Sequence, residues 1–409
     1  MKRLLIVVLI MALTIVSTGC TSSERAFLEA YKKTMNINSM ESQMTFNASL
    51  KGEGFSQEQQ LVVDEISNLL SNIQISMAQR MTQNQDKTAS KAYVEMNMNV
   101  GGLIVPMSVW VDVNMASDSP KLVEYIKMPQ MLMSTIYPEK PALQYIVYDF
   151  NKIIGEQMNF NELMKFSKEV QPKVEKVIDS YMNNFDPGVE VIKSKGKRNV
   201  GGESLSIYEV KLDDASFKKL LTSTVNYSLD DEEMINFIKD YMKFVVNVAT
   251  AAQEGQISQE EVANEIDNLD KQLPQAKAKF NELMDSIKDV KIIGDDGIVI
   301  EYGINKDGYI VYEAGTIDFR LDLDALNKLG NANTTTAEPV KGVLNLKLNY
   351  SSNTKNINKN VEITMPEVNE QNSIDFMDFM NMTSSYSSVG VIGSSDGPTS
   401  VYIESTLNK

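Results

Sequence analysis

The sequence contains no histidine and a single cysteine, Cys20, among its 409 residues. Without histidine, the chain cannot assemble a Ser-His-Asp or Cys-His arrangement, and it has no imidazole to bind zinc, haem or copper. A single thiol also excludes a disulfide within the chain. Any catalysis would therefore have to use carboxylates, lysine, tyrosine or serine. We expect no cofactor, and we expect the protein not to be an enzyme.

Basic residues are scarce as well. The chain has 39 lysines and arginines against 55 aspartates and glutamates, which gives a formal net charge of −16. An acidic surface repels phosphate backbones, so we expect no nucleic-acid partner. The same charge should keep the body of the protein off an anionic bilayer.

The first nineteen residues have the order of a secretory signal. Lys2 and Arg3 form a positive start, an apolar run follows from Leu4 to Val16, and Ser17 to Gly19 are small. This order is typical of a cleaved signal peptide. The apolar run is shorter than the roughly 20 residues that a membrane-spanning helix needs. The segment therefore predicts a signal rather than a permanent membrane helix.

Cys20 follows directly after Gly19. This arrangement resembles the lipobox of bacterial lipoproteins, although Ser17 stands where leucine is commonest in that family. The resemblance implies a signal peptide at residues 1–19, a diacylglyceryl group on Cys20, and acylation of the new terminus by chains such as palmitate. Two or three chains hold a protein firmly, whereas one chain binds only marginally. The alternative is an ordinary secreted protein in which the cysteine has no such role.

The lipobox resemblance also predicts where the protein works. Residues 20–23 become a lipidated tether, and the membrane becomes a partner through the lipid on Cys20. We therefore expect a lipoprotein on the cell membrane of a bacterial envelope, facing the extracytoplasmic side.

Alternating apolar and polar residues dominate the body, which we place at residues 24–367. The strand-like segments lie at 42–50, 73–77, 94–100, 103–113, 122–127, 143–149, 189–212, 289–323, 344–350 and 361–365. Residues 101–102 and 199–202 predict tight turns within this set, and Pro106 indicates a sheet edge or a bulge. Helical periodicity appears at 24–35, at 56–71, between 159 and 181, at 215–221 and in a large insertion at 229–288. Acidic residues at 230–233 indicate the first turn of that insertion. Strands with one apolar face must bury that face, and helices can cover it. The fold class predicted is α+β: a large curved antiparallel sheet, half-barrel-like, with helices packed on one face.

This layout resembles the half-barrel lipid carriers and lipoproteins of the LolA and LppX type. The resemblance covers residues 24–367 in pattern only, and it implies an apolar cavity that holds a lipid or another apolar ligand. The 24 methionines are consistent either with a flexibly filled core or with an adaptable apolar surface. The function predicted is non-catalytic binding of an apolar ligand or of an envelope partner.

Two other functions stay open at this point. One is a structural or interaction ectodomain that has a filled core and no small-molecule ligand. The other is a carboxylate-based hydrolase, which would need two inward-facing carboxylates in one cleft.

Acidic residues gather in the second half of the chain without forming a recognisable motif. Asp318, Asp322 and Asp324 alternate with apolar residues, which predicts solvated charges on an outer face; calcium binding is the alternative. Residues 295–297, Asp-Asp-Gly, lack the later glutamate of an EF-hand loop and predict a hairpin turn. The sequence predicts no metal site.

The last residues, 368–409, have the composition of an acidic and serine-rich linker followed by a tail. Residues 389–399 resemble a glycine-rich signature in the membrane β subunit of sodium-translocating decarboxylases. That resemblance implies sodium contact at Asp396, but Ser394 and Ser395 replace the usual Gly-Ala pair and the membrane helices of that family are missing. The alternative is a turn between two β-prone runs. We expect residues 383–409 to lie outside the main core.

Overall fold

The computed structural model describes residues 22–115, 120–150, 152, 169–170, 172–174, 176–181, 184–252, 269–329, 340–384, 389–391 and 401–403. Cys20, the predicted signal peptide and Asp396 lie outside these ranges. The predictions for those three features therefore stay predictions.

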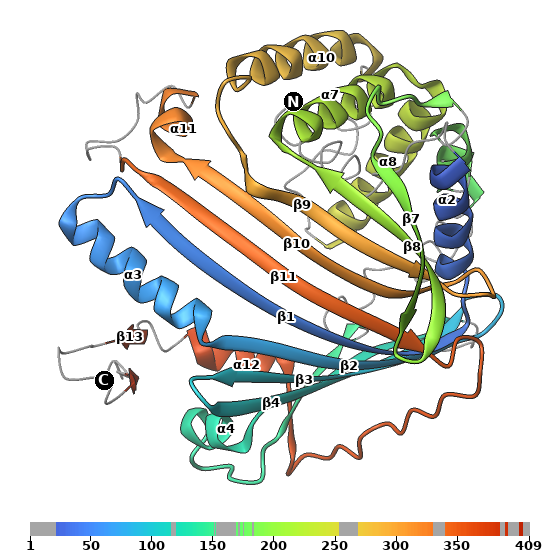
Figure 1. The fold of residues 1–409 in the computed structure, drawn as a ribbon. Helices are drawn as coiled ribbons and strands as arrows, with labels where there is room; N and C mark the ends of the chain where they lie inside the picture. Colours follow the sequence, from blue (N-terminus) through green and yellow to red (C-terminus); the bar gives the residue numbers. More distant parts are fainter. Residues whose placement is uncertain are drawn as a thin grey trace.

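Twelve of the described strands form one open, curved sheet (Figure 1). The strands are β1 (Ser39–Glu53), β2 (Ile73–Gln83), β3 (Ala89–Val100), β4 (Leu103–Asn114), β5 (Lys121–Lys127), β6 (Tyr145–Asp149), β7 (Ile192–Val200), β8 (Glu203–Leu212), β9 (Ile293–Ile304), β10 (Ile310–Asp322), β11 (Val343–Lys355) and β12 (Ser373–Asp375). Their order is β12-β6-β5-β4-β3-β2-β1-β11-β10-β9-β8-β7. Within this described sheet only β12 and β6 pair in parallel. The predicted fold class, α+β with a large half-barrel-like antiparallel sheet, is confirmed.

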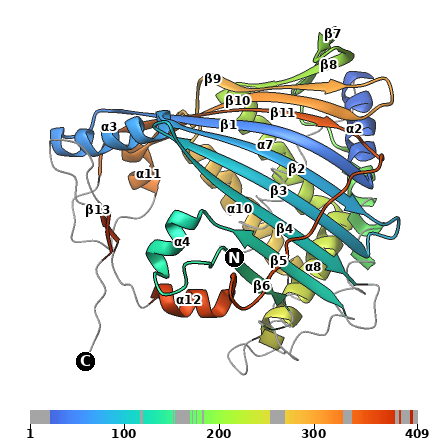
Figure 2. The same ribbon diagram turned by 90° about the horizontal axis from the view of Figure 1, so that it is seen from below.

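Eight helices have described bounds alongside the sheet, and residues 176–181 are helical as well. The eight are α2 (Ser22–Met35), α3 (Gln57–Ser71), α4 (Gln130–Ile136), α7 (Asp214–Asp230), α8 (Glu232–Ala252), α10 (Leu269–Ser286), α11 (Leu323–Leu329) and α12 (Phe376–Ser384). Figure 2 shows α7, α8 and α10 together on one side of the sheet. Buried apolar side chains hold these three helices to one another, with Val225 and Leu229 from α7, Ile238 from α8 and Phe280 from α10.

The short helix predicted at 215–221 and the start of the predicted insertion at 229 belong to one helix, α7. Asp213 caps α7, because its side chain accepts a hydrogen bond from the N–H of Ser216 at 2.8 Å. Asp231 then opens α8 by accepting from the N–H of Met234 at 2.8 Å. The acidic residues that suggested one helix start at 229–233 therefore mark a junction between two helices.

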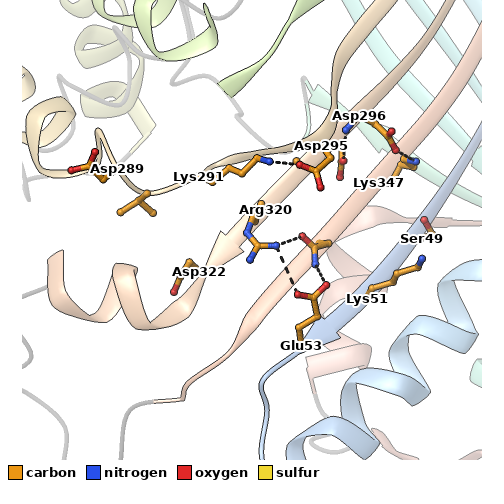
Figure 3. A pocket seen from close by; sticks show the side chains of 14 residues that line it. Ser49, Lys51, Glu53, Asp289, Lys291, Asp295, Asp296, Arg320, Asp322 and Lys347 are labelled. Atoms are coloured by element: carbon orange, nitrogen blue, oxygen red, sulfur yellow. Dashed lines mark hydrogen bonds and ion pairs between the residues drawn. The ribbon is translucent and has the colours of Figure 1, made fainter. Parts of the chain in front are cut away.

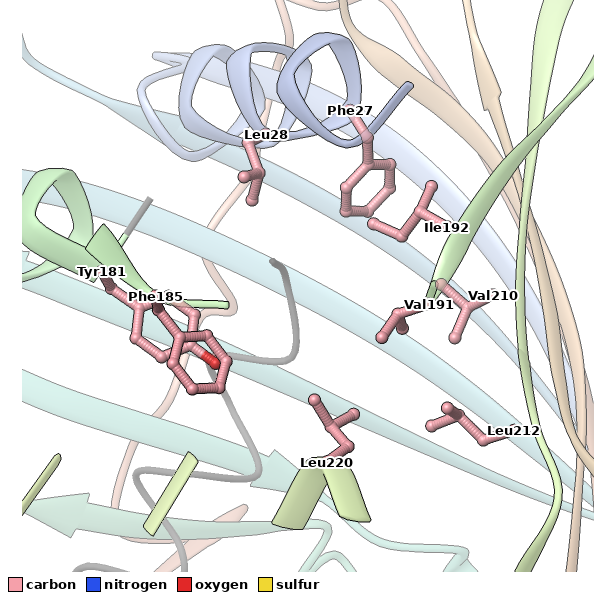
Figure 4. Close-up of a cluster of buried hydrophobic side chains, with 9 residues drawn as sticks. All are labelled: Phe27, Leu28, Tyr181, Phe185, Val191, Ile192, Val210, Leu212 and Leu220. Carbon is pink, nitrogen blue, oxygen red and sulfur yellow. The ribbon is translucent and has the colours of Figure 1, made fainter. Parts of the chain in front are cut away.

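A second buried cluster joins α2 to the β7–β8–β9 end of the sheet (Figure 4). Phe27 and Leu28 on α2 meet Ile192 on β7 and Val210 on β8. The ring of Phe27 also meets the ring of Tyr302 on β9 edge-on, with 4.8 Å between the ring centroids. Helix α2 therefore lies on the same face of β9 as Tyr302.

Two hairpins use the same four-residue sequence, Asn-Val-Gly-Gly. Residues 99–102 join β3 to β4, and residues 199–202 join β7 to β8. All four glycines have φ between 58° and 94°, a region that glycine enters without strain. In each turn the asparagine side chain accepts a hydrogen bond from the N–H of the second glycine, at 2.9 Å and 3.1 Å. Both turns were predicted from the sequence.

Pro106 lies inside β4 without breaking the sheet. It pairs with Asn97 of β3 on one side. On the other side, the pairing of β4 with β5 begins only at Ser108. Pro106 therefore occupies a stretch of β4 that projects beyond β5, which agrees with the predicted edge position.

The predicted hairpin at residues 295–297 is wrong. Strand β9 continues through these residues without reversing, while the β9–β10 turn contains Asp307 and Gly308. Gly297 instead has φ +73° at an irregularity in the strand, where an added Cβ would lie 2.7 Å from the carbonyl oxygen of Leu212. Gly297 therefore allows β9 to pass close to Leu212 at the end of β8, and the chain does not reverse there.

The structure also differs from the boundary predicted at residue 367. Strand β12 joins the sheet edge beside β6, and Ile374 is buried with Met133, Leu143 and Ile146. Helix α12 contributes Phe376 and Phe379 to the same cluster. The main body therefore extends through α12. Beyond it, β13 (Val389–Val391) and β14 (Val401–Ile403) pair with each other in a separate sheet.

Candidate functional site

One face of the sheet can be followed by register from β9 to β4. Ile300 on β9 packs against the cluster of α2 and α7. The residues paired in succession from it are Gly315, Tyr350, Phe46, Ile75, Met98 and Val105. Because opposite residues in paired strands share a face, this whole row lies on the helix-facing side.

A row of four methionines runs beside this one on the same side. Met44 of β1 lies opposite Met77 of β2. Met77 lies opposite Met96 of β3, and Met96 opposite Met107 of β4. Alternate residues of a strand share a face, so Met44 faces the same way as Phe46. All four side chains, which we call the methionine row, are half-buried.

The central strands contribute no buried apolar side chain. Within the described strands β1, β2, β3, β4 and β11, the only buried residues are polar: Ser39, Ser42 and Ser352. The buried apolar clusters lie elsewhere, among the helices and at the two ends of the sheet. The middle of the sheet therefore presents an apolar surface that the protein's own core does not cover closely.

Polar residues continue the methionine row across β11, β10 and β9. Ser352 lies opposite Met44, and Glu313 of β10 lies opposite Ser352. Tyr302 of β9 lies opposite Glu313. The hydroxyl of Tyr350 donates a hydrogen bond to Oε1 of Glu313 at 2.5 Å.

Beside Glu313 is a cavity of about 260 Å³. It is lined by Tyr31, Thr34, Tyr302, Ile310, Val311, Tyr312, Glu313, Ser352 and Thr354. Burial raises the pKa of the Glu313 carboxyl, and the hydrogen bond from Tyr350 only partly opposes this effect. Burial is also the main cause of the raised pKa of Tyr302 and of Tyr350. Both tyrosine hydroxyls therefore stay protonated and able to donate.

Sequence reasoning missed Glu313, although a signal was present. The residue has the same parity along its strand as Ile317, Phe319 and Leu321. Strand alternation alone therefore places this carboxyl on the apolar face. Its partner Tyr350 could not be found in this way, because the pairing of β10 with β11 is needed to bring the two together.

The opposite face of the sheet carries a second hollow, of about 720 Å³ (Figure 3). Its lining is Ser49, Lys51, Glu53, Asp289, Val290, Lys291, Gly294, Asp295, Asp296, Asp318, Arg320, Asp322, Asn345 and Lys347. Several charges here are already paired: Lys347 with Asp296, and Lys291 with Asp295. Arg320 donates to Asn345 at 3.1 Å and lies 3.9 Å from Glu53. Most of the charged side chains that line the hollow are therefore already neutralised by partners within it.

The prediction that Asp318 is a solvated charge is wrong. It is only 8% exposed, and its carboxylate accepts a hydrogen bond from the N–H of Asp296 at 3.0 Å. Asp322 accepts from the N–H of Ala325 at 3.0 Å at the start of α11. Across the described residues, no cluster of three or more acidic side chains is arranged to hold a metal ion. Asp318 and Asp322 stabilise local backbone instead.

Helix α3 turns most of its apolar stripe outward. Leu61, Val62, Ile66 and Leu69 are 66%, 53%, 43% and 54% exposed. Val63 is the residue that α3 buries against the sheet. Helical periodicity places Val62, Ile66 and Leu69 on one stripe, but it does not say whether a neighbour covers that stripe.

Among the described helices, none is both long and apolar enough to cross a membrane.

No protein-family model matches this chain, and no curated protein matches it. The comparison with solved structures finds the crystal structure of the lipoprotein LppX of Mycobacterium tuberculosis. That structure is 11% identical in sequence, and the match covers 84% of this chain and 100% of LppX with a TM-score of 0.26. The chain is similar to this lipoprotein at that low level, and the comparisons assign it to no family.

Proposed function

We propose that this protein is a non-catalytic, lipid-anchored extracytoplasmic lipoprotein that binds an apolar ligand on the helix-facing side of its sheet. One observation carries the proposal: the five central strands align apolar side chains on one face, and none of those side chains is buried. These half-buried side chains leave part of the possible hydrophobic stabilisation unused, because each Å² of apolar surface removed from water contributes about 25 cal/mol. A ligand that covers this face would recover that free energy.

The residue types suit such a ligand. Methionine is unbranched and polarisable, so a methionine surface can adapt to apolar molecules of different shapes. The methionine row supplies one such side chain from each of four adjacent strands.

The anchor is the second part of the proposal. It rests on the order of the first twenty residues, with Cys20 placed directly after the small residues of the predicted cleavage site. Lipid on Cys20 would hold the body at the extracytoplasmic surface of the cell membrane.

The binding proposal is tested on residues 21–409 produced without lipid. Titration with the neutral apolar fluorophore Nile red should give saturable enhancement of its fluorescence. The double substitution Met77→Gln and Met96→Gln should weaken binding about tenfold or more, since it places two amides on the apolar face.

The matched control is Ser76→Gln with Asn97→Gln. Ser76 and Asn97 lie opposite each other on the same two strands but on the other face. The control should bind Nile red as the wild type does. Absence of saturable binding by the wild type, or equal loss in the two variants, would contradict the proposal.

The outward stripe of α3 favours a second candidate, an interaction ectodomain that binds an envelope protein and no small ligand. Substitution of Leu61 and Leu69 by glutamine would then abolish a specific cross-link to that partner at the cell surface. Under this alternative the wild type would not bind Nile red.

A further inference from the structure

We propose that the cavity beside Glu313 binds the ammonium group of a cationic amphiphile whose apolar chain lies along the methionine row. This inference rests on the proposed function, because it assumes an apolar ligand on the helix-facing side.

Tyrosine rings and one carboxyl from three elements line the cavity. Tyr31 of α2 and Tyr302 of β9 line it together with Glu313 of β10, and Tyr350 of β11 holds the carboxyl through its hydroxyl. The faces of tyrosine rings attract cations, and an ionised carboxylate supplies the countercharge. This combination fits a substituted ammonium group.

Neighbouring groups hold two of these rings in place. The edge contact with Phe27 orients the ring of Tyr302. The ring of Tyr350 lies over Gly315, where an added Cβ would be 2.8 Å from its Cε1 atom. The site is thus built before any ligand arrives, which lowers the entropic cost of binding.

The described residues place no positive side chain against Glu313. Lys33 of α2 donates instead to the carbonyl oxygen of Asp307 at 2.5 Å and lies over the ring of Tyr309. Arg198 pairs with Glu301 at 2.8 Å. An anionic head group would meet the like charge of Glu313, whereas a cation would complete an ion pair in a partly desolvated site.

Two residues that line the cavity, Glu313 and Ser352, lie in the same cross-strand row as the four methionines. Glu313, Ser352, Met44, Met77, Met96 and Met107 lie opposite one another in succession on six adjacent strands. With a spacing of about 4.8 Å between strands, the row extends roughly 24 Å from Glu313. A long alkyl chain anchored by its ammonium group at Glu313 could follow this row.

Two probes with the same alkyl chain isolate the head group: dodecyltrimethylammonium and dodecyl maltoside, each titrated below its micelle concentration into residues 21–409 in a calorimeter. The wild type should bind the ammonium probe about tenfold more tightly than the neutral one. Glu313→Gln should remove that preference and leave binding of dodecyl maltoside unchanged, which also verifies that the variant is folded.

Glu301→Gln is the matched control, because Glu301 lies on the adjacent strand and pairs with Arg198. This variant should keep the full preference for the ammonium probe.

The preference should also depend on pH. The titratable groups that face Glu313 are Tyr302 of β9, Tyr350 of β11 and Tyr31 of α2. Burial raises the pKa of Tyr302 and Tyr350, so these two do not titrate near neutrality. The preference for the ammonium probe should therefore grow as the pH rises through the raised pKa of Glu313 and disappear below it.

Equal affinity for the two probes, or a preference that survives in Glu313→Gln, would overturn the head-group inference and leave the apolar-ligand proposal standing. Failure of both probes to bind would overturn the apolar-ligand proposal and, with it, the inference.

Discussion

Met77 of β2 lies directly opposite Met96 of β3, and both side chains are half-buried on the helix-facing side of the sheet. Strand β2 pairs with β1 on one side and β3 on the other, and β3 pairs in turn with β4. The buried apolar clusters nevertheless lie among α7, α8 and α10 and at the ends of the sheet. An apolar surface that lies apart from the buried core in this way suits a binding protein.

Lys218 should be important for stability. It is 9% exposed, lies 2.7 Å from Asp214, and donates to the carbonyl oxygens of Lys288 and Val290 at 3.1 Å and 2.7 Å. Lys218→Met leaves a partly buried carboxylate without its partner, so we expect a loss of about 3 kcal/mol in the free energy of unfolding. Urea unfolding measures this loss. Lys219→Met, a substitution at the exposed neighbouring residue, should lower the free energy of unfolding by well under half as much.

Asp214 should make stability depend on acid. Burial alone would raise its pKa, but hydrogen bonds from Lys218 and from the N–H groups of Ile293 and Ile292 prevail and hold the pKa below its usual value. The stabilisation from the ionised form is therefore complete above the ordinary pKa of about 4 and is lost as the pH falls through the lowered one. The gap in thermal midpoint between wild type and Asp214→Asn should narrow with acidification. A gap that stays constant down to pH 3 would show that this ionisation contributes nothing.

Glu313 should have the opposite effect on stability. Its pKa is raised in the folded protein, so the protonated form is favoured and stability falls as the pH rises through that value. Without ligand, Glu313→Gln should therefore gain stability relative to the wild type at pH 8 but not at pH 4. A thermal-midpoint difference that does not change with pH would contradict the burial of this carboxyl.

Gly294 should tolerate no side chain while Asp318 is present. A Cβ at Gly294 would lie 2.2 Å from Oδ2 of Asp318, so Gly294→Ala must displace the carboxylate that accepts from the N–H of Asp296. We expect a cost of about 2 kcal/mol. In an Asp318→Ala background the same substitution should cost much less, and a double-mutant cycle measures this coupling. Additive costs would mean that the two positions do not interact.

The predicted anchor is tested on whole cells. Cys20→Ser should prevent both lipid attachment and cleavage at this position. Cells fed labelled fatty acid should give a labelled wild-type band and an unlabelled variant band in the membrane fraction. Equal labelling of the two bands would exclude Cys20 as the acceptor.

Local patterns predicted much of the fold, because strand alternation and turn chemistry act over a few residues. The Asn-Val-Gly-Gly turns and the strand around Phe46 follow from such patterns. Tertiary pairing decided the rest. Met44 and Met107 belong to one row only because four strands align in one register. The burial of Asp318 likewise depends on contacts with β9.

The same limit applies to the candidate site. Abundant methionine suggested either a core or an adaptable surface, and composition could not decide between them. Alternation could have placed Glu313 on the apolar face, but its contact with Tyr350 depends on pairing with a strand that lies about thirty residues further along the chain.

An apolar ligand that covers the methionine row must contact its four methyl groups. Nuclear magnetic resonance of protein labelled at the methionine methyl carbons, and assigned by single Met→Leu variants, detects this contact. On addition of dodecyl maltoside, the methyl signals of Met44, Met77, Met96 and Met107 should shift together and saturate with the ligand. Those of Met131 and Met377, which are 62% and 46% exposed on α4 and α12, should stay in place. Binding that shifts the signals of Met131 and Met377 but leaves the four row signals unchanged would show that the ligand does not lie on the methionine row.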